Sequence, residues 1–202
     1  KETFALAVQN QQKNKLQVAQ KLYKEILKKN PNHFGSIFYL GTLFAQTERF
    51  ELAKPLLQKA IQINPNYAPA HNNLGAALKK LGEYQKAINY CQKAIQINPN
   101  YADAHNNLGA ALKELGEYQK AINYCQKAIK SQPNLVSAHI NLGLIFQELG
   151  KYQKAIDCYK KLRQVQPNSA NAHQNLGKLY MVLGHIQRAI SPYQDALKYE
   201  PE

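Results

Sequence analysis

A period of 34 residues constrains this chain more than any other feature of its sequence. Residues 68–101 and 102–135 are identical except at six positions, and the same frame extends toward both ends of the chain. A fixed period of roughly 20 to 50 residues is the signature of repeat architectures. The period divides the 202 residues into six units: 1–33, 34–67, 68–101, 102–135, 136–169 and 170–202.

Each unit carries two runs of apolar residues with helical spacing. In the third unit, the first run covers residues 70–81 and stops at Gly82, a residue type that commonly ends helices. The second run covers residues 84–97 and stops before Pro99, because the residue that precedes a proline disfavours helical geometry. The sequence therefore predicts an all-α fold of six helical hairpins, in which each hairpin needs its neighbours to bury its apolar faces.

The repeated pattern L-G-x2-[LFY], G-x-Y-x2-A-I, A-[IL] and N-P-N closely resembles the tetratricopeptide repeat, and the resemblance covers the entire chain. It implies a right-handed superhelix, an α-solenoid of six helix-turn-helix repeats, with the first helix of each repeat lining a concave groove. Members of that family mostly hold proteins or peptides in this groove. The implied function is a non-enzymatic scaffold that binds an extended segment of a partner protein. We expect residues 1–202 to form a single array that belongs to a longer protein.

The face of the first helices opposite their apolar stripe carries polar residues, and the resemblance assigns this face to the groove. An asparagine recurs directly before the Leu-Gly pair of units three to six, at Asn73, Asn107, Asn141 and Asn175. This series resembles the asparagine ladder of O-linked N-acetylglucosamine transferases, in which the amides hold a peptide by its backbone. The alternative is that these amides are only solvated. Further expected groove residues are Asn72, Asn106, Lys79 and Lys113.

The first two units depart from the asparagine series. They carry Ala5 and Tyr39 at the ladder position. Together with Phe4 and Phe38, Tyr39 suggests an apolar pocket at the amino-terminal end, so Phe38 and Tyr39 are also expected to contact the ligand. Related proteins that bind chaperone tails carry basic residues four positions before the groove asparagine. In this chain those positions hold residues that are not basic, which argues against a receptor for chaperone tails. They are Gly35, Pro69, Asp103, Ser137 and Asn171.

One histidine recurs at the same place of the first helices, as His71, His105, His139 and His173. Successive first helices lie about 10 Å apart, whereas zinc requires ligand bonds of about 2 Å. The imidazoles therefore cannot converge on one ion, and we expect half-buried packing histidines and no metal site. The three cysteines are expected to fill the core: Cys91, Cys125 and Cys158.

The positive net charge of +13 is concentrated on the second helices. Basic residues recur seven positions apart, which is two helical turns, and so share one face. This arrangement predicts a basic stripe on the convex surface. The stripe leaves open an alternative function, binding of nucleic acid or an acidic membrane, although no arginine-rich run accompanies it and exposed lysines commonly serve solubility. The stripe comprises Lys59, Lys93, Lys127, Lys161, Lys86, Lys120, Lys154 and Arg188.

Several functional classes find no support in the sequence. It has no nucleophile elbow, phosphate-binding glycine loop or H-E-x-x-H motif, so neither an active site nor a cofactor is expected. Three cysteines in no disulfide pattern favour a reducing compartment, and we expect a cytoplasmic location. The longest stretch without a charged residue, 60–78, has 19 residues, but Pro65, Pro69 and several polar side chains interrupt it, so it is not the continuous apolar run of ~20 residues that spans a bilayer.

The two ends of the array differ. Polar residues from Gln9 to Gln12 stand in the first unit where later units are apolar, which is typical of a capping repeat. The last unit stops after its second helix, without a further polar helix to cover it. We therefore expect either self-association through this carboxyl-terminal face or fraying after Pro192, which removes a backbone hydrogen bond.

Overall fold

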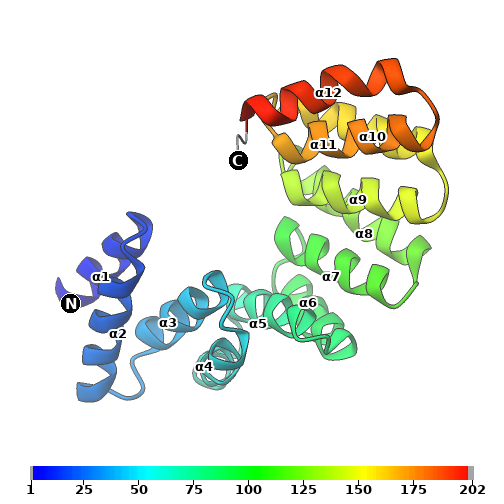
Figure 1. Ribbon diagram of the computed structural model, residues 1–202. Helices are drawn as coiled ribbons and strands as arrows, with labels where there is room; N and C mark the ends of the chain where they lie inside the picture. The colour runs from blue at the N-terminus through cyan, green and yellow to red at the C-terminus, as the bar shows by residue number, and fades with distance from the viewer. Residues whose placement is uncertain (1, 200–202) are drawn as a thin grey trace. The chain divides into compact units, whose positions relative to one another are not determined.

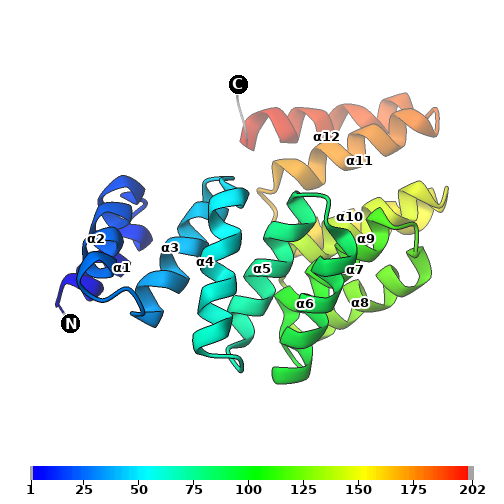
Figure 2. The same cartoon turned by 90° about the horizontal axis from the view of Figure 1, so that it is seen from below.

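The computed structural model describes residues 2–199, which form twelve α-helices and no strand. Figures 1 and 2 show consecutive helices paired as antiparallel hairpins. The prediction of an all-α fold with six hairpins is confirmed. The helices are α1 Glu2–Gln12, α2 Leu16–Lys29, α3 Phe34–Gln46, α4 Phe50–Ile63, α5 Ala68–Lys80, α6 Tyr84–Ile97, α7 Ala102–Glu114, α8 Tyr118–Ser131, α9 Val136–Glu148, α10 Tyr152–Val165, α11 Ala170–Val182 and α12 Ile186–Tyr199.

The helices form two compact units that divide after Pro99. The first unit contains α1 to α6, and the second contains α7 to α12. Within each unit the two helices of a hairpin pack together, and the second helix also packs on the first helix of the next hairpin, as α4 does on α5 and α8 on α9. Each unit is thus a helical repeat stack, in which burial depends on neighbouring hairpins as the sequence predicts.

The turn inside each hairpin requires a residue with positive φ. Glycine supplies it in the last four hairpins, with φ between 67° and 76°, and the backbone N–H of Glu83 after the first of these glycines bonds to the carbonyl of Leu78 at 2.9 Å. In the first two hairpins Asn14 and Glu48 adopt φ of 57° instead. A non-glycine residue in this region carries a strain of roughly 1–2 kcal/mol.

The two helices of a hairpin approach most closely where a glycine faces the second helix. A Cβ atom added to Gly75 would lie 2.6 Å from Sγ of Cys91, and one added to Gly143 would lie 2.6 Å from the ring of Tyr159. All three cysteines are buried free thiols, as predicted. Burial raises the pKa of Cys91 to about 12, so this thiol stays protonated and inert at neutral pH.

The carboxyl-terminal helix α12 is continuous through Pro192 to Tyr199. Pro55 likewise lies inside α4, which continues to Ile63. Pro192 is itself buried, and fraying of the helix after it stays a prediction. Among residues 2–199, none of the helices has the length and apolar character needed to cross a membrane.

Candidate ligand-binding surface of the first helices

The expected ladder asparagines occupy equivalent positions on successive first helices. Asn107, Asn141 and Asn175 lie on α7, α9 and α11 of the second unit, and all three are partly exposed. Helices α7 and α9 contact each other directly, so the first two of these side chains share a continuous surface. Asn73 on α5 has the same partial exposure in the first unit, where α3 and α5 are in contact.

A hydrogen-bonded relay of side chains joins two first helices of the second unit. Asn141 donates through Nδ2 to Oδ1 of Asn106 at 2.8 Å, and Asn106 donates through Nδ2 to Oγ of Ser137 at 3.0 Å. Asn106 on α7 is buried and thus connects to two residues of α9. Sequence reasoning missed this relay, which fixes the orientation of the Asn141 amide before any ligand arrives.

The first unit contains a related contact. Asn73 on α5 donates through Nδ2 to Oγ1 of Thr42 on α3 at 3.0 Å, and the Thr42 hydroxyl donates to the carbonyl of Phe38 at 2.9 Å. In both units, a ladder asparagine therefore bonds to the preceding first helix. The ladder contributes to packing between repeats as well as to the surface.

Three residues expected in the groove lie beneath its surface instead. Asn72 and Asn106 are each 5% exposed, and Phe38 is 6% exposed. Successive residues on an α-helix are about 100° apart, so the neighbour of an outward-facing asparagine turns toward the next helix. These three side chains support the surface, and the prediction that they line it is corrected.

Charged residues near the ends of α7 and α9 are paired. Nζ of Lys113 on α7 lies 2.8 Å from Glu114 and 3.2 Å from Glu148 on α9. Burial opposes protonation of this lysine, but its hydrogen bonds to both carboxylates outweigh that effect and raise the pKa of Lys113. Lys113 thus stays charged and is neutralised locally. Lys79, at the same position of α5, is partly exposed.

The aromatic residues of the first unit form a packed cluster where the sequence suggested an apolar pocket. Phe4 lies 5.8 Å from Tyr39 between ring centroids, and Phe38 lies 5.3 Å from Tyr39 and 5.0 Å from Tyr67. The ring of Phe4 also fits against Gly35, where a Cβ atom would lie 2.6 Å away. The rings fill the space between α1, α3 and their neighbours. Of the two expected ligand contacts here, Tyr39 is partly exposed and Phe38 is not.

The repeated histidines are buried and bind the loop that precedes their helix. Nε2 of His71, His139 and His173 lies 2.8 Å from the carbonyl oxygen of Pro65, Pro133 and Pro167, respectively. The expectation of half-buried histidines is corrected, because the rings are buried. Each of these bonds anchors the connection between two repeats. In the part of the chain that the structure describes, no group of three or more His, Cys, Asp or Glu could hold a metal ion.

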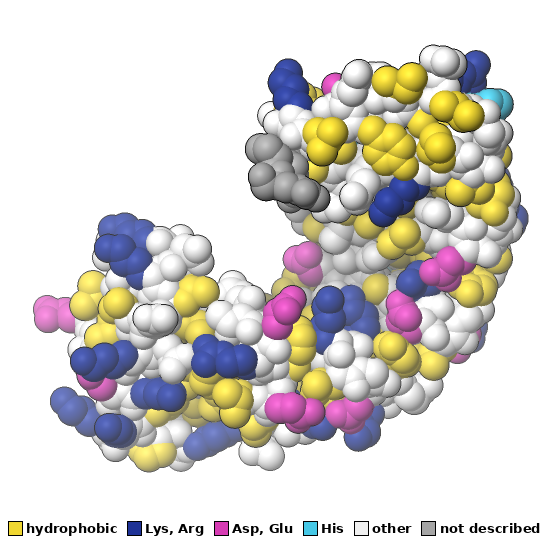
Figure 3. Space-filling model, in the orientation of Figure 1, with side chains coloured by type: hydrophobic (Ala, Val, Ile, Leu, Met, Phe, Trp, Pro, Cys, Tyr) yellow, Lys and Arg dark blue, Asp and Glu magenta, His cyan; other side chains and the backbone are white. Residues whose placement is uncertain are grey.

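The basic stripe of the second helices is partly matched by local acceptors. Lys86 and Lys120 form ion pairs with the glutamates three residues before them, at 2.6 and 2.5 Å. Lys127 lies over the ring of Tyr124 at 5.1 Å. On the face drawn in Figure 3, basic and acidic side chains likewise lie beside each other near the middle of the chain. The stripe is exposed, but several of its basic side chains are paired with neighbouring side chains.

Family models for tetratricopeptide repeats match most of the sequence. Models described as tetratricopeptide repeat match residues 68–101, 102–135, 124–157 and 170–202, and one described as TPR repeat matches residues 41–82 and 145–184. The chain belongs to the tetratricopeptide repeat family. Proteins of this family are generally interaction scaffolds with protein or peptide partners. No curated protein has a significant match to the sequence.

Several solved structures are similar to the chain. A crystal structure of MamA is 27% identical, covers 79% of this chain and 94% of its own, and has a TM-score of 0.67. The pilF protein of Pseudomonas aeruginosa is 19% identical over 99% and 91% of the two chains, with a TM-score of 0.80. YrrB, described as a TPR protein with an unusual peptide-binding site, is 20% identical over 89% and 93%, with a TM-score of 0.60. The last two likenesses show the fold alone.

Proposed function

We propose that this chain is a non-enzymatic scaffold that holds an extended peptide of a partner protein on its first-helix surfaces. In the second unit the principal contacts are Asn107, Asn141 and Asn175. In the first unit Asn73, Tyr39 and Lys79 occupy the corresponding surface. The observation that carries the proposal is the relay from Asn141 through buried Asn106 to Ser137, because it presents an oriented amide on a partly exposed surface.

The chemistry of a primary amide suits recognition of a peptide main chain. An asparagine side chain has two donors and an acceptor with two lone pairs. Asn141 uses one N–H to bond to Asn106. Its second N–H and its carbonyl oxygen can pair with a peptide C=O and N–H, whatever side chains the peptide carries. Recognition of this kind tolerates changes in peptide sequence.

The spacing of the ladder sets a register for the peptide. Successive first helices lie about 10 Å apart, which equals three extended residues at about 3.3 Å each. Each ladder amide of one unit should therefore hold roughly every third residue of the peptide. The local pairing of Lys113 with Glu114 and Glu148 agrees with this picture, because a neutralised lysine selects weakly for acidic peptides.

A peptide titration tests the proposal. A peptide selected from a random library against the wild-type chain is titrated calorimetrically into the wild type and into the variant Asn107→Ala, Asn141→Ala, Asn175→Ala. Three neutral hydrogen-bonding groups at about 0.5–1.5 kcal/mol each predict a loss of affinity between roughly tenfold and a thousandfold. The control is Asn89→Ala with Asn123→Ala, two exposed asparagines on the second helices. Unchanged affinity in a folded triple variant would reject the proposal.

Self-association is a second candidate function, and one feature of the last hairpin favours it. Val182, Ile186 and Leu197 are each about 60% exposed on α11 and α12, at 61%, 60% and 63%. A second copy of the chain that packs on this face would cover these side chains. Sedimentation of the wild type and of Ile186→Ser with Leu197→Ser, over a range of concentrations, distinguishes a dimer from a monomer.

The state of the cysteines supports a cytoplasmic location. All three are buried thiols that form no disulfide in the described part of the chain. A reducing compartment preserves that state. Fractionation of cells that express the tagged natural protein tests this assignment.

A further inference from the structure

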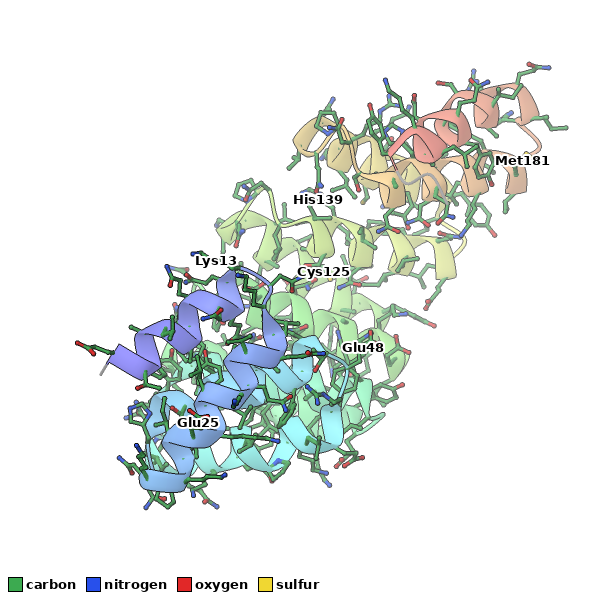
Figure 4. All side chains as sticks on the ribbon, turned by 60° about the vertical axis from the view of Figure 1, so that its left-hand side comes forward. Lys13, Glu25, Glu48, Cys125, His139 and Met181 are labelled. Atoms are coloured by element: carbon green, nitrogen blue, oxygen red, sulfur yellow. The ribbon has the colours of Figure 1, made fainter. Side chains whose placement is uncertain are left out.

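A pocket of about 300 Å³ opens on the second-helix side of the second unit, away from the ladder asparagines. It lies between α8, α9 and α10, and its apolar walls are Ile129, Leu142 and Phe146. His139 on α9 and Cys158 on α10 complete the inner part; Figure 4 labels His139 on its helix. We call this cavity the repeat-five pocket, since α9 and α10 form the fifth hairpin.

The histidine in this pocket has a defined hydrogen-bonding state. Nε2 of His139 lies 2.8 Å from the carbonyl oxygen of Pro133, so this nitrogen carries a proton. The ring is 4% exposed and lines the pocket. Nδ1 is then the nitrogen left to meet a ligand, as an acceptor in the neutral ring or as a donor in the protonated ring.

The sixth hairpin contains a related arrangement, in which a carboxylate lies near the equivalent histidine. His173 occupies the position of His139, and its Nε2 bonds to the carbonyl of Pro167 in the same way, at 2.8 Å. Asp195 stands one period after Lys161, and its Oδ2 lies 3.5 Å from Nδ1 of His173. The repeat geometry thus places a carboxylate near Nδ1 of this histidine, although the two atoms are not hydrogen-bonded in the structure.

Three lining residues distinguish the repeat-five pocket from the third and fourth hairpins: Phe146 replaces a leucine, Asp157 replaces an asparagine and Cys158 replaces a tyrosine. Tyr90 and Tyr124 stand at the position of Cys158, and their rings lie 6.0 and 5.9 Å from His71 and His105. The cavity beside His71 is accordingly bordered by that tyrosine and by polar residues, whereas the pocket beside Cys158 extends to Leu142 and Phe146. The smaller side chain gives the fifth hairpin an apolar floor.

The rim of the pocket is positively charged. Lys154 and Lys161, both exposed, flank it two helical turns apart on α10, and Nζ of Lys154 lies 5.7 Å from the centroid of the Phe146 ring. Asp157 lies between the two lysines and accepts a hydrogen bond from Gln153 at 3.1 Å. Two ammonium groups thus face one carboxylate, and this excess favours an anion.

We propose that the repeat-five pocket binds a small carboxylic acid with an apolar body. The carboxylate lies between the ammonium groups of Lys154 and Lys161, and it accepts a hydrogen bond from Nδ1 of His139 in the protonated ring, since Nε2 already donates to Pro133. The apolar body covers Leu142 and Phe146. At the ~30 Å³ that one water molecule takes in the liquid, the pocket admits about ten heavy atoms. This site is independent of peptide binding to the first helices.

Octanoate, octanamide and acetate form a matched set of probes for this pocket. Octanoate and octanamide have the same size, and acetate lacks the apolar body. Each is titrated into the 202-residue chain and followed by amide NMR shifts. Octanoate is expected to shift the signals of Leu142, Phe146 and Cys158 saturably, with an affinity roughly tenfold or more above that of either control. Equal binding of octanoate and octanamide, or no saturable shift at these residues, would overturn the proposal.

Two variants taken from the chain's own repeats locate the site. Cys158→Tyr restores the residue of the third and fourth hairpins, and Lys161→Asp restores the residue of the sixth. Cys158→Tyr should weaken octanoate binding by covering the apolar surface of Leu142 and Phe146, and Lys161→Asp should abolish it by supplying an internal carboxylate. Lys130→Asp makes the same charge change at an exposed position outside the pocket lining and should bind octanoate as the wild type does. Unaltered binding by the folded Lys161→Asp variant would refute the site, even if Cys158→Tyr failed to fold.

Discussion

The second and fifth hairpins use the same helical position in different ways. At the ladder position of the second hairpin, Tyr39 joins a cluster of packed aromatic rings, whereas Asn141 in the fifth hairpin completes a relay of amide hydrogen bonds. The aromatic cluster stabilises the first unit through apolar burial. The relay gives less apolar burial but presents oriented donors and acceptors. One repeat scaffold thus supports a packed end and a polar recognition surface.

The largest predicted effect is on the aromatic side of this comparison. Phe38→Ala removes a buried ring that contacts Phe34, Tyr39 and Tyr67. We expect a loss of about 3–5 kcal/mol in the free energy of unfolding, the usual range for truncation of a buried phenylalanine. Urea denaturation followed by circular dichroism measures it. A loss below about 1 kcal/mol would show that the cluster is not a structural core.

Truncation of the relay should have a smaller effect on stability. Asn106→Ala leaves Asn141 and Ser137 without their shared partner, and we expect a loss of about 1–3 kcal/mol. Asn175→Ala, at a ladder position for which the structure shows no such bond to another first helix in residues 2–199, serves as the control and should change stability little. Equal effects of the two variants in the same urea titration would argue against a structural role of the relay.

A turn substitution should stabilise the first unit. Glu48 adopts φ of 57°, where the later hairpins have glycine. Glu48→Gly should therefore raise the free energy of unfolding by about 1 kcal/mol through relief of backbone strain. Gly82→Ala, with φ of 76° at the native glycine, is the matched substitution and should lower it by a similar amount. Thermal unfolding of both variants checks the sign, and a destabilised Glu48→Gly would contradict the assignment of strain.

The smallest effect is expected for the basic stripe. Replacement of Lys93, Lys127 and Lys161 by glutamine should change stability by less than about 1 kcal/mol per residue, because all three are exposed. Peptide binding should be unchanged. Filter binding of RNA and flotation with acidic vesicles test the alternative function. Strong, steeply salt-dependent binding that the triple variant loses would promote the stripe to a functional surface.

Much of the fold could be predicted from the sequence, because the 34-residue period and the residues that end each helix are local signals. Gly82 and Pro99 mark the ends of the helices in the third unit, and α5 and α6 end within two residues of the predicted positions. The burial of Cys91 also follows from its place on an apolar stripe. Each of these inferences needs only neighbouring residues and the geometry of one helix.

The site could be predicted only in part, since its details depend on contacts between repeats. The sequence placed Asn141 on a polar face but gave no measure of how far Asn106 turns inward, and their hydrogen bond joins residues 35 positions apart. The prediction that Phe38 lies at the surface is wrong, because periodicity alone does not show that neighbouring rings cover this side chain. The bond from His71 to the carbonyl of Pro65 likewise involves a backbone atom that no motif specifies.

The central claim is that the second unit recognises a peptide by its main chain. The most direct test compares a library-selected peptide with two derivatives: one of the same composition in scrambled order, and one with its backbone nitrogens methylated at every third residue. We predict that scrambling changes the calorimetric affinity only slightly, whereas methylation in the ladder register weakens it roughly tenfold or more through the loss of several N–H donors. Loss of binding on scrambling, with full binding of the methylated peptide, would contradict the claim.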